Sequence, residues 1–167
     1  MIIKKSKNNS KWNGLSIKNS FDLEYECLEL INNNFKCKCK CQKNNHFPKI
    51  ISCNKDNFIF ELSDCGISLN NYRQYVKQKK IKPIKIVNLD EQIDCIISNL
   101  KEKKIKHLDM TLCGKNLCIN SNGIISLIDF DIAAIDDKFM SEKIKARDHD
   151  NYYIWLKQRI INITKKL

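Results

Sequence analysis

The most informative stretch of the sequence is HLDMTLCGKNLCINSNGIISLIDFDIA, residues 107–133. It begins with one acidic cluster, HLD at 107–109, and nearly ends with another, DFD at 129–131. Between the clusters lie Asn116 and two short apolar runs, at 117–119 and 124–128, joined by the polar sequence NSNG. Because an Asn-Gly pair supplies the left-handed conformation that tight hairpin turns need, these residues predict a β-hairpin.

Polar side chains stand on both sides of this predicted hairpin. Asp109, on the preceding loop, can accept a proton or orient a hydroxyl group. Asn116 and Asp129 offer the hard oxygen ligands that Mg²⁺ prefers. The three residues predict a phosphoryl-transfer site, because that chemistry depends mostly on positioning and charge neutralisation.

The same motifs resemble those of the protein-kinase-like superfamily. HLD is similar to the H-R-D of the catalytic loop, NLCI at 116–119 to the start of the following strand, and DFD to the D-F-G. From Asn116 to Asp129 there are 13 positions, as in the family, whereas Asp109 and Asn116 are seven apart rather than five. The departure is a two-residue insertion within Thr111–Lys115. The resemblance implies that Asp109, Asn116 and Asp129 are catalytic, with ATP as phosphate donor and Asn116 and Asp129 as Mg²⁺ ligands.

Upstream sequences extend the resemblance to the N-terminal lobe. FPKII at 47–51 is similar to the entry of the fourth kinase strand, and FIFELSDCGISL at 58–69 to the fifth strand and hinge. Phe60 then stands at the gatekeeper position, and the backbone of Glu61 and Ser63 is expected to meet the adenine of ATP. Glu24 matches the glutamate of the αC helix, and Lys4 or Lys5 is expected to pair with it and steady the ATP phosphates.

Several family features are absent or altered. No G-x-G-x-x-G occurs, no A-P-E follows, Thr111 replaces the lysine after H-R-D, and Asp131 replaces the D-F-G glycine. Lys115 is a candidate substitute for the missing lysine, and only 36 residues follow Asp131. The resemblance therefore implies an α+β, protein-kinase-like fold in a single domain. It would combine a reduced N-lobe sheet without the glycine-rich loop (1–65) and an abbreviated helical C-lobe (66–167).

Apolar periodicity predicts the other elements. Helices are expected over 21–31, 69–77, 89–105 and 150–165, and strands over 2–4, 48–52 and 57–62. Ser20 is expected to cap the N-terminus of the first helix. The last helix is expected to bury Trp155, Leu156, Ile160 and Ile163.

The chain contains nine cysteines. Without a signal-peptide pattern, reduced thiols are expected rather than a disulfide framework. The alternative is a metal site formed by Cys37, Cys39 and Cys41, with His46 and Cys53 downstream. A metal site is not expected, because zinc usually uses C-x2–4-C pairs and these cysteines alternate.

The formal charge is +11 at pH 7, from 30 Lys and Arg against 19 Asp and Glu. Such an excess is typical of polyanion binding, but the lysines are scattered. The chain is also rich in Asn and Ile, a bias of AT-rich genomes such as those of parasites and large DNA viruses. No apolar run approaches the ~18 residues of a membrane span. A soluble protein of the cytoplasm is expected, the host cytoplasm if the source is viral.

Three functions remain open from the sequence. The first is an ATP- and Mg²⁺-dependent phosphotransferase that resembles an atypical serine/threonine protein kinase, acting on a protein or small-molecule acceptor. The second is a catalytically inactive kinase-like module with a binding or regulatory role. The third is a basic module that binds nucleic acid. In the first two, His107 is expected to buttress the catalytic loop rather than transfer protons.

Overall fold

The computed structural model describes residues 1–6, 16–33, 37, 39, 46–136 and 151–167. These residues form four helices and eight strands, and the strands make three small antiparallel sheets, β1-β3-β2, β4-β6-β7 and β5-β8. In chain order the elements are β1 (Ile2–Lys5), α2 (Ile17–Asn32), β2 (Ile50–Asn54), β3 (Ile59–Leu62), β4 (Ile67–Ser68), α3 (Leu69–Lys77), α4 (Leu89–Glu102), β5 (Ile105–His107), β6 (Leu117–Ile119), β7 (Ile125–Leu127), β8 (Ala133–Ile135) and α6 (Tyr152–Thr164). The α+β class predicted from the sequence is confirmed.

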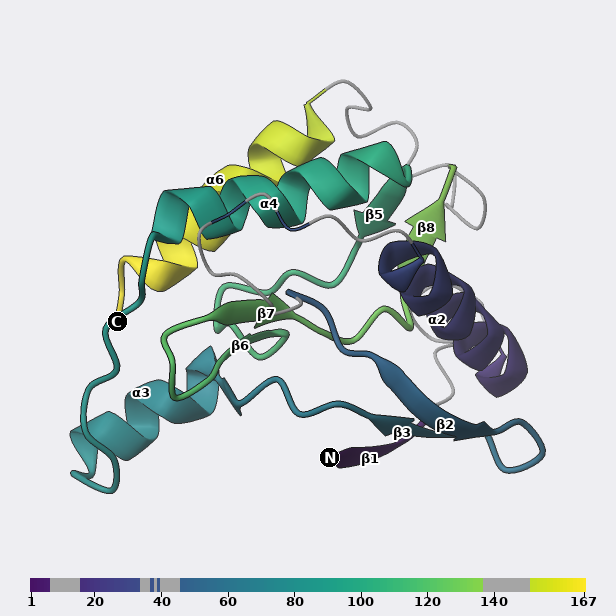
Figure 1. The fold of residues 1–167 in the computed structure, drawn as a ribbon, viewed down its shortest axis with the longest axis horizontal. Coiled ribbons are helices and arrows are strands. Elements are labelled where there is room, and N and C mark those ends of the chain that lie inside the picture. Colours follow the sequence, from purple (N-terminus) through teal and green to yellow (C-terminus); the bar gives the residue numbers. More distant parts are fainter. Residues whose placement is uncertain (7–15, 34–36, 38, 40–45, 137–150) are drawn as a thin grey trace.

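The N-terminal sheet is built around its central strand, β3, and α2 packs against it (Figure 1). Lys4 of β1 pairs with Phe60 of β3, and directly opposed residues point to the same face of a sheet. Phe60 is fully buried and stacks on Phe21 of α2, with ring centroids 4.3 Å apart. The face that carries Lys4 is therefore the face covered by α2. Lys5, the next residue along the strand, points to the other face.

Helix α2 begins one turn earlier than predicted. Ser16, not Ser20, is the N-cap, and its Oγ accepts a hydrogen bond from the Asn19 amide at 3.2 Å. Ser20 lies inside the helix, is fully buried, and donates its amide to the Ser16 carbonyl at 2.9 Å. The two serines offer the same local capping signal, so the prediction of Ser20 was wrong because packing of the first turn decides between them.

The two long helices of the second half, α4 and α6, pack side by side (Figure 1). The apolar period of α4 predicts a buried face of Ile93, Ile96, Ile97 and Leu100. Ile93, Ile96 and Leu100 are inaccessible to solvent, whereas Ile97 is only half-buried. None of the helices in the described part of the chain combines the length and apolarity that crossing a bilayer requires.

In helix α6 the predicted burial is confirmed for three of four residues, since Leu156, Ile160 and Ile163 are fully buried. The predicted burial of Trp155 was wrong, because 44% of this residue is exposed. It precedes Leu156 by one residue and is therefore rotated about 100° away from the core-facing side. Its ring instead lies 5.6 Å from the Arg159 guanidinium. Residue 150, the predicted start of this helix, lies outside the described residues.

The predicted hairpin is confirmed as β6 and β7, which pair antiparallel through Leu117 and Leu127 at one end and Ile119 and Ile125 at the other. These four side chains are fully buried and form the centre of the core. Strand β4 extends the sheet by pairing with β6. Gly66, just before β4, has φ +92°, and a Cβ there would meet the Ile119 carbonyl oxygen at 2.2 Å.

We predict that Gly66→Ala lowers the free energy of unfolding by about 2–4 kcal/mol, because it combines a strained left-handed backbone with a backbone clash. Urea denaturation followed by circular dichroism measures this change. Ser121→Ala, at an exposed turn position, is the control and should stay within about 0.5 kcal/mol of wild type. Equal midpoints for the two variants would contradict the close approach of the chain at Gly66 to β6.

Candidate functional site

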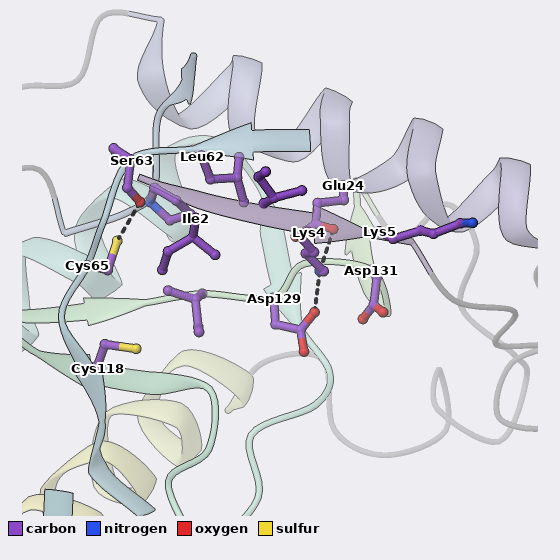
Figure 2. Close-up of a pocket in the computed structure, with 13 residues that line it drawn as sticks. Ile2, Lys4, Lys5, Glu24, Leu62, Ser63, Cys65, Cys118, Asp129 and Asp131 are labelled. Carbon is purple, nitrogen blue, oxygen red and sulfur yellow. Dashed lines mark hydrogen bonds and ion pairs between the residues drawn. The ribbon is translucent and has the colours of Figure 1, made fainter. Parts of the chain in front are cut away.

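A cavity of about 400 Å³ lies between the N-terminal sheet and the segment that follows β7. Its volume falls within the usual range for small-molecule sites. Strand β1, helix α2, the β3–β4 connection and the residues after β7 all contribute to its walls (Figure 2). The lining residues are Ile2, Ile3, Lys4, Lys5, Glu24, Pro48, Leu62, Ser63, Cys65, Cys118, Ile128, Asp129 and Asp131.

The two ends of the cavity differ in polarity, as Figure 2 shows. Apolar and sulfur-bearing side chains gather at one end, namely Ile2, Leu62, Cys65 and Cys118. Charged side chains gather at the other, namely Lys4, Glu24, Asp129 and Asp131. A ligand with an apolar part and a polar part that carries or binds a cation matches this division.

Lys4 is the centre of the charged end. Its Nζ lies 2.5 Å from Glu24 Oε2 and also forms an ion pair with Asp129 Oδ1. Burial acts to lower the pKa of the Lys4 ammonium, but the charges of Glu24, Asp129 and Asp131 outweigh burial and hold that pKa above its ordinary value. Of the two candidate lysines, the structure therefore brings Lys4 to Glu24. Lys5 is exposed and its ammonium points away from the acidic groups (Figure 2).

Glu24 joins α2 to the segment after β7. It is fully buried, and its Oε1 accepts the backbone N–H of Phe130 at 3.2 Å while Oε2 accepts from Lys4. Burial raises the pKa of the Glu24 carboxyl, although the Lys4 ammonium acts to lower it. One carboxylate thus holds both the strand that carries Lys4 and the backbone beside Asp129.

Asp129 has an unusual backbone, with φ +70°. A non-glycine residue in this region stores about 1 kcal/mol or more of strain, and such residues cluster at functional sites. Burial acts to raise the pKa of its carboxyl, but the Lys4 ammonium outweighs burial and holds that pKa below its ordinary value. Asp131, two residues on, lines the same cavity. The sequence marked Asp131 only as a departure from D-F-G, yet it brings a third carboxylate to this cavity, beside those of Glu24 and Asp129.

The predicted catalytic loop places Asp109 and Asn116 in contact. The Asn116 amide nitrogen donates to the Asp109 backbone oxygen at 2.7 Å and to its Oδ2 at 3.0 Å. Lys115 Nζ lies 3.0 Å from the same Oδ2, and this hydrogen bond raises the pKa of the Lys115 ammonium. The loop between Asp109 and Asn116 thus brings a lysine to Asp109. Neither Asp109 nor Asn116 is among the residues that line the cavity.

His107 supports this loop from the inside. It is almost fully buried, its Nε2 lies 2.8 Å from the Ile128 oxygen, and its ring contacts Phe130 edge-on at 4.9 Å. Burial lowers the pKa of the imidazole, so the ring is neutral near pH 7. The Tyr152 hydroxyl of α6 donates to the His107 carbonyl at 2.6 Å. These contacts agree with a buttressing role.

The segment predicted to meet an adenine lies at the apolar end of the cavity. Phe60 is buried in the core against α2, and Glu61 is not among the lining residues. Ser63 lines the cavity, but its N–H donates to the Lys49 carbonyl at 2.9 Å. Among the residues that the structure describes, its carbonyl accepts only the weak thiol donor of Cys65, at 3.9 Å. Ser63 therefore offers an acceptor that a stronger donor can take over.

The donor set fits a divalent cation and a polyanionic ligand. Asp129 and Asp131 provide carboxylate oxygens, and hard cations such as Mg²⁺ favour oxygen ligands. Lys4 adds a positive charge beside these carboxylates. Asn116, the other predicted ligand, does not line the cavity, and its amide nitrogen donates to Asp109. The charged end can thus hold a cation together with phosphate groups.

We predict that Lys4→Met lowers the free energy of unfolding by about 2–4 kcal/mol, because it leaves the buried Glu24 carboxylate without its cation. Lys5→Met is the matched control, one residue away on the exposed face, and should change stability by less than about 0.5 kcal/mol. Urea denaturation at pH 7 measures both. Similar losses for the two variants would show that Lys4 has no special role in the fold.

No protein-family model matches the chain, and no curated protein matches it in sequence. The chemistry of the cavity residues therefore carries the functional inference.

Proposed function

We propose that the chain is an ATP- and Mg²⁺-dependent phosphotransferase with a reduced protein-kinase-like fold. The observation that carries the proposal is the position of Lys4 between Glu24 and Asp129 at the charged end of the cavity. In the family that the motifs resemble, a strand lysine pairs with a helix glutamate and an aspartate holds the metal. Lys4, Glu24 and Asp129 were identified from separate motifs, and they are in contact here although Lys4 and Asp129 are 125 positions apart in the sequence.

The order of the elements supports the same proposal. A small antiparallel sheet with one helix, α2, comes first, and the β3–β4 connection leads into a mainly helical part. The β6–β7 hairpin then separates the Asp109 loop from Asp129. We assign 1–65 to a reduced N-lobe and 66–167 to an abbreviated C-lobe.

The apolar end suits a nucleobase. Ile2 and Leu62 come from the sheet and Cys118 from the hairpin, so the base would lie between the two parts of the molecule. The Ser63 carbonyl stands at the edge of this space as the acceptor for an exocyclic amine. In this proposal the Ser63 carbonyl alone forms the adenine-binding edge, because Glu61 lies in the central strand β3 and does not line the cavity.

The charged end suits the phosphates. Lys4 would neutralise phosphate oxygens, while Asp129, with Asn116 and Asp131, would hold Mg²⁺. When bound, Mg²⁺ supplies charge neutralisation on the transferring phosphoryl group. Pairing with Lys4 keeps the pKa of Asp129 below its ordinary value, so this ligand is ionised at neutral pH.

Asp109 is the residue proposed to orient the acceptor hydroxyl. Lys115 is proposed to take the place of the lysine that Thr111 replaces, because its ammonium already pairs with Asp109 Oδ2. Such a cation would stabilise negative charge as the phosphoryl group moves between donor and acceptor. The two-residue insertion would then relocate the lysine rather than abolish it.

A specific observation favours a second candidate, a kinase-like module that binds nucleotide without turnover. Asp109 is held by both Asn116 and Lys115 and does not line the cavity. An aspartate so engaged is a weaker partner for an acceptor hydroxyl. Turnover, rather than nucleotide binding, separates the two candidates.

Nucleotide binding and turnover test the proposal in one series. We expect wild type to bind ATP only with Mg²⁺ and to release ADP slowly, with water or its own hydroxyl groups as acceptor. Asp129→Asn should lose Mg²⁺-dependent binding. Asp109→Asn should keep binding and lose at least about 100-fold in ADP release. Asp56→Asn, in the exposed β2–β3 turn, is the control for loss of a carboxylate.

Calorimetry and a coupled ADP assay give the two readouts. Wild-type protein that does not bind Mg-ATP would refute both kinase-like candidates. Binding without turnover in wild type would select the nucleotide-binding module.

Lys115→Met tests the relocated lysine. We expect ADP release to fall about 10-fold or more with ATP affinity unchanged, since the lysine would act on the transition state rather than on the bound nucleotide. The control is Lys104→Met, which removes a comparable exposed ion pair, with Asp136, away from the cavity. Equal turnover in the two variants would show that Lys115 has only an electrostatic surface role.

A further inference from the structure

A second cluster of chemically reactive side chains lies outside the nucleotide cavity. Cys37, Cys39 and His46, from the connection between α2 and β2, meet Cys95 of α4. One donor atom from each residue lies within 4.8 Å of all the others. His46 is fully buried, and Cys39 and Cys95 are 6% and 5% exposed. Three sulfurs and one imidazole form the Cys₃His ligand set of structural zinc sites.

The distances between donor atoms are close to those around a tetrahedral ion. Zinc–sulfur bonds of ~2.3 Å and zinc–nitrogen bonds of ~2.0 Å place neighbouring ligands roughly 3.5–3.8 Å apart. Cys95 Sγ lies 3.8 Å from Cys37 Sγ, Cys39 Sγ 3.1 Å from His46 Nε2, and Cys37 Sγ 2.9 Å from Cys39 Sγ. These three pairs would need to lengthen by less than about 1 Å to surround zinc, and every other pair of donors lies within 4.8 Å.

The imidazole of His46 is oriented as a metal ligand. Its Nδ1 lies 2.7 Å from the Ile125 carbonyl, which fixes the proton on Nδ1 and leaves Nε2 as the lone-pair donor toward the sulfurs. Metal-bound histidines usually donate their other ring N–H to such an acceptor. Asn99 gives Cys95 similar support, because its Nδ2 donates to the Cys95 carbonyl at 2.7 Å and lies 3.7 Å from Sγ.

We propose that Cys37, Cys39, His46 and Cys95 form a structural zinc site. Four protein ligands complete a tetrahedron and leave no open position for substrate, so the ion has a structural role. In this structure Cys39 is disulfide-bonded. A thiol reductant must first add two electrons and two protons to that bond. Zinc then binds as the three ligand thiols release their protons.

The site ties together parts of the fold that are distant in sequence. Cys37 and Cys95 are 58 positions apart. The His46 backbone oxygen also accepts the Leu127 N–H at 2.9 Å, so the same segment holds strand β7. Zinc would thus fasten the α2–β2 connection to both α4 and the central hairpin. This role is independent of any nucleotide chemistry.

From the sequence we expected no metal site, and this set of four ligands was not predicted. The ligands considered from the sequence were Cys37, Cys39, Cys41, His46 and Cys53. Cys41 lies outside the described residues, and Cys53 lies on β2 and is not part of the cluster. The fourth ligand is Cys95 of α4, which was not among the ligands considered from the sequence.

Metal content tests the proposal. Protein prepared with zinc and a thiol reductant is expected to carry one zinc ion per chain by mass spectrometry. Co²⁺ in its place should show the thiolate charge-transfer absorption of a tetrahedral site. Cys95→Ser should lose the ion and the absorption, whereas Cys53→Ser, the matched control, should keep both. Metal-free wild type, or equal metal content in the two variants, would overturn the proposal.

A wild-type measurement covers the case in which Cys95→Ser does not fold. With zinc bound, alkylation of the folded protein should spare Cys37, Cys39 and Cys95 and label the exposed Cys113. A chelator should expose the three cysteines and lower the melting temperature by at least about 5 °C. Alkylation of all three at the same rate with and without chelator would refute zinc ligation.

Discussion

The structure depends on one half-buried ammonium, that of Lys4. Lys4 bonds two carboxylates, and one of them, Glu24, is fully withdrawn from solvent. Removing such charges from water is costly, and the cost is offset only when the partners are correctly placed and hydrogen-bonded. Strand β1, helix α2 and the segment after β7 must therefore be in register with one another. The Phe130 amide, which donates to Glu24, completes this arrangement.

Beside this contact lies the buried β6–β7 hairpin, which supports the loops that carry the candidate site residues. Strands β6 and β7 are fully buried and place Asn116 just before one strand and Asp129 shortly after the other. Helix α6 holds the preceding loop through Tyr152 and through Arg159, which donates to the Met110 carbonyl at 3.2 Å. The His46 segment holds β7 from its other edge, so a zinc ion there would stiffen the same hairpin that carries the candidate metal ligands.

The local elements could be predicted because their signals are local. Helix α3 spans the predicted residues, α4 has the predicted buried face, and the turn that ends at Gly123 joins the predicted strands. The 13-residue interval from Asn116 to Asp129 follows from that hairpin, whose length is set by two three-residue strands and their turn. Ser20 was misplaced because Ser16, four residues earlier, offers the same capping signal. Trp155 was misplaced because an apolar side chain does not by itself show that its position faces the core.

The α+β class, the hairpin and the polar residues around it can be predicted from local patterns in the sequence. Which lysine meets Glu24 depends on packing, because alternation along β1 directs Lys4 and Lys5 to opposite faces and α2 covers only one of them. Packing also brings Cys95 to Cys37 and Cys39, and Asp131 to Lys4 in one cavity. These choices depend on contacts between distant segments. Sequence spacing cannot report such contacts, because packing rather than local propensity selects them.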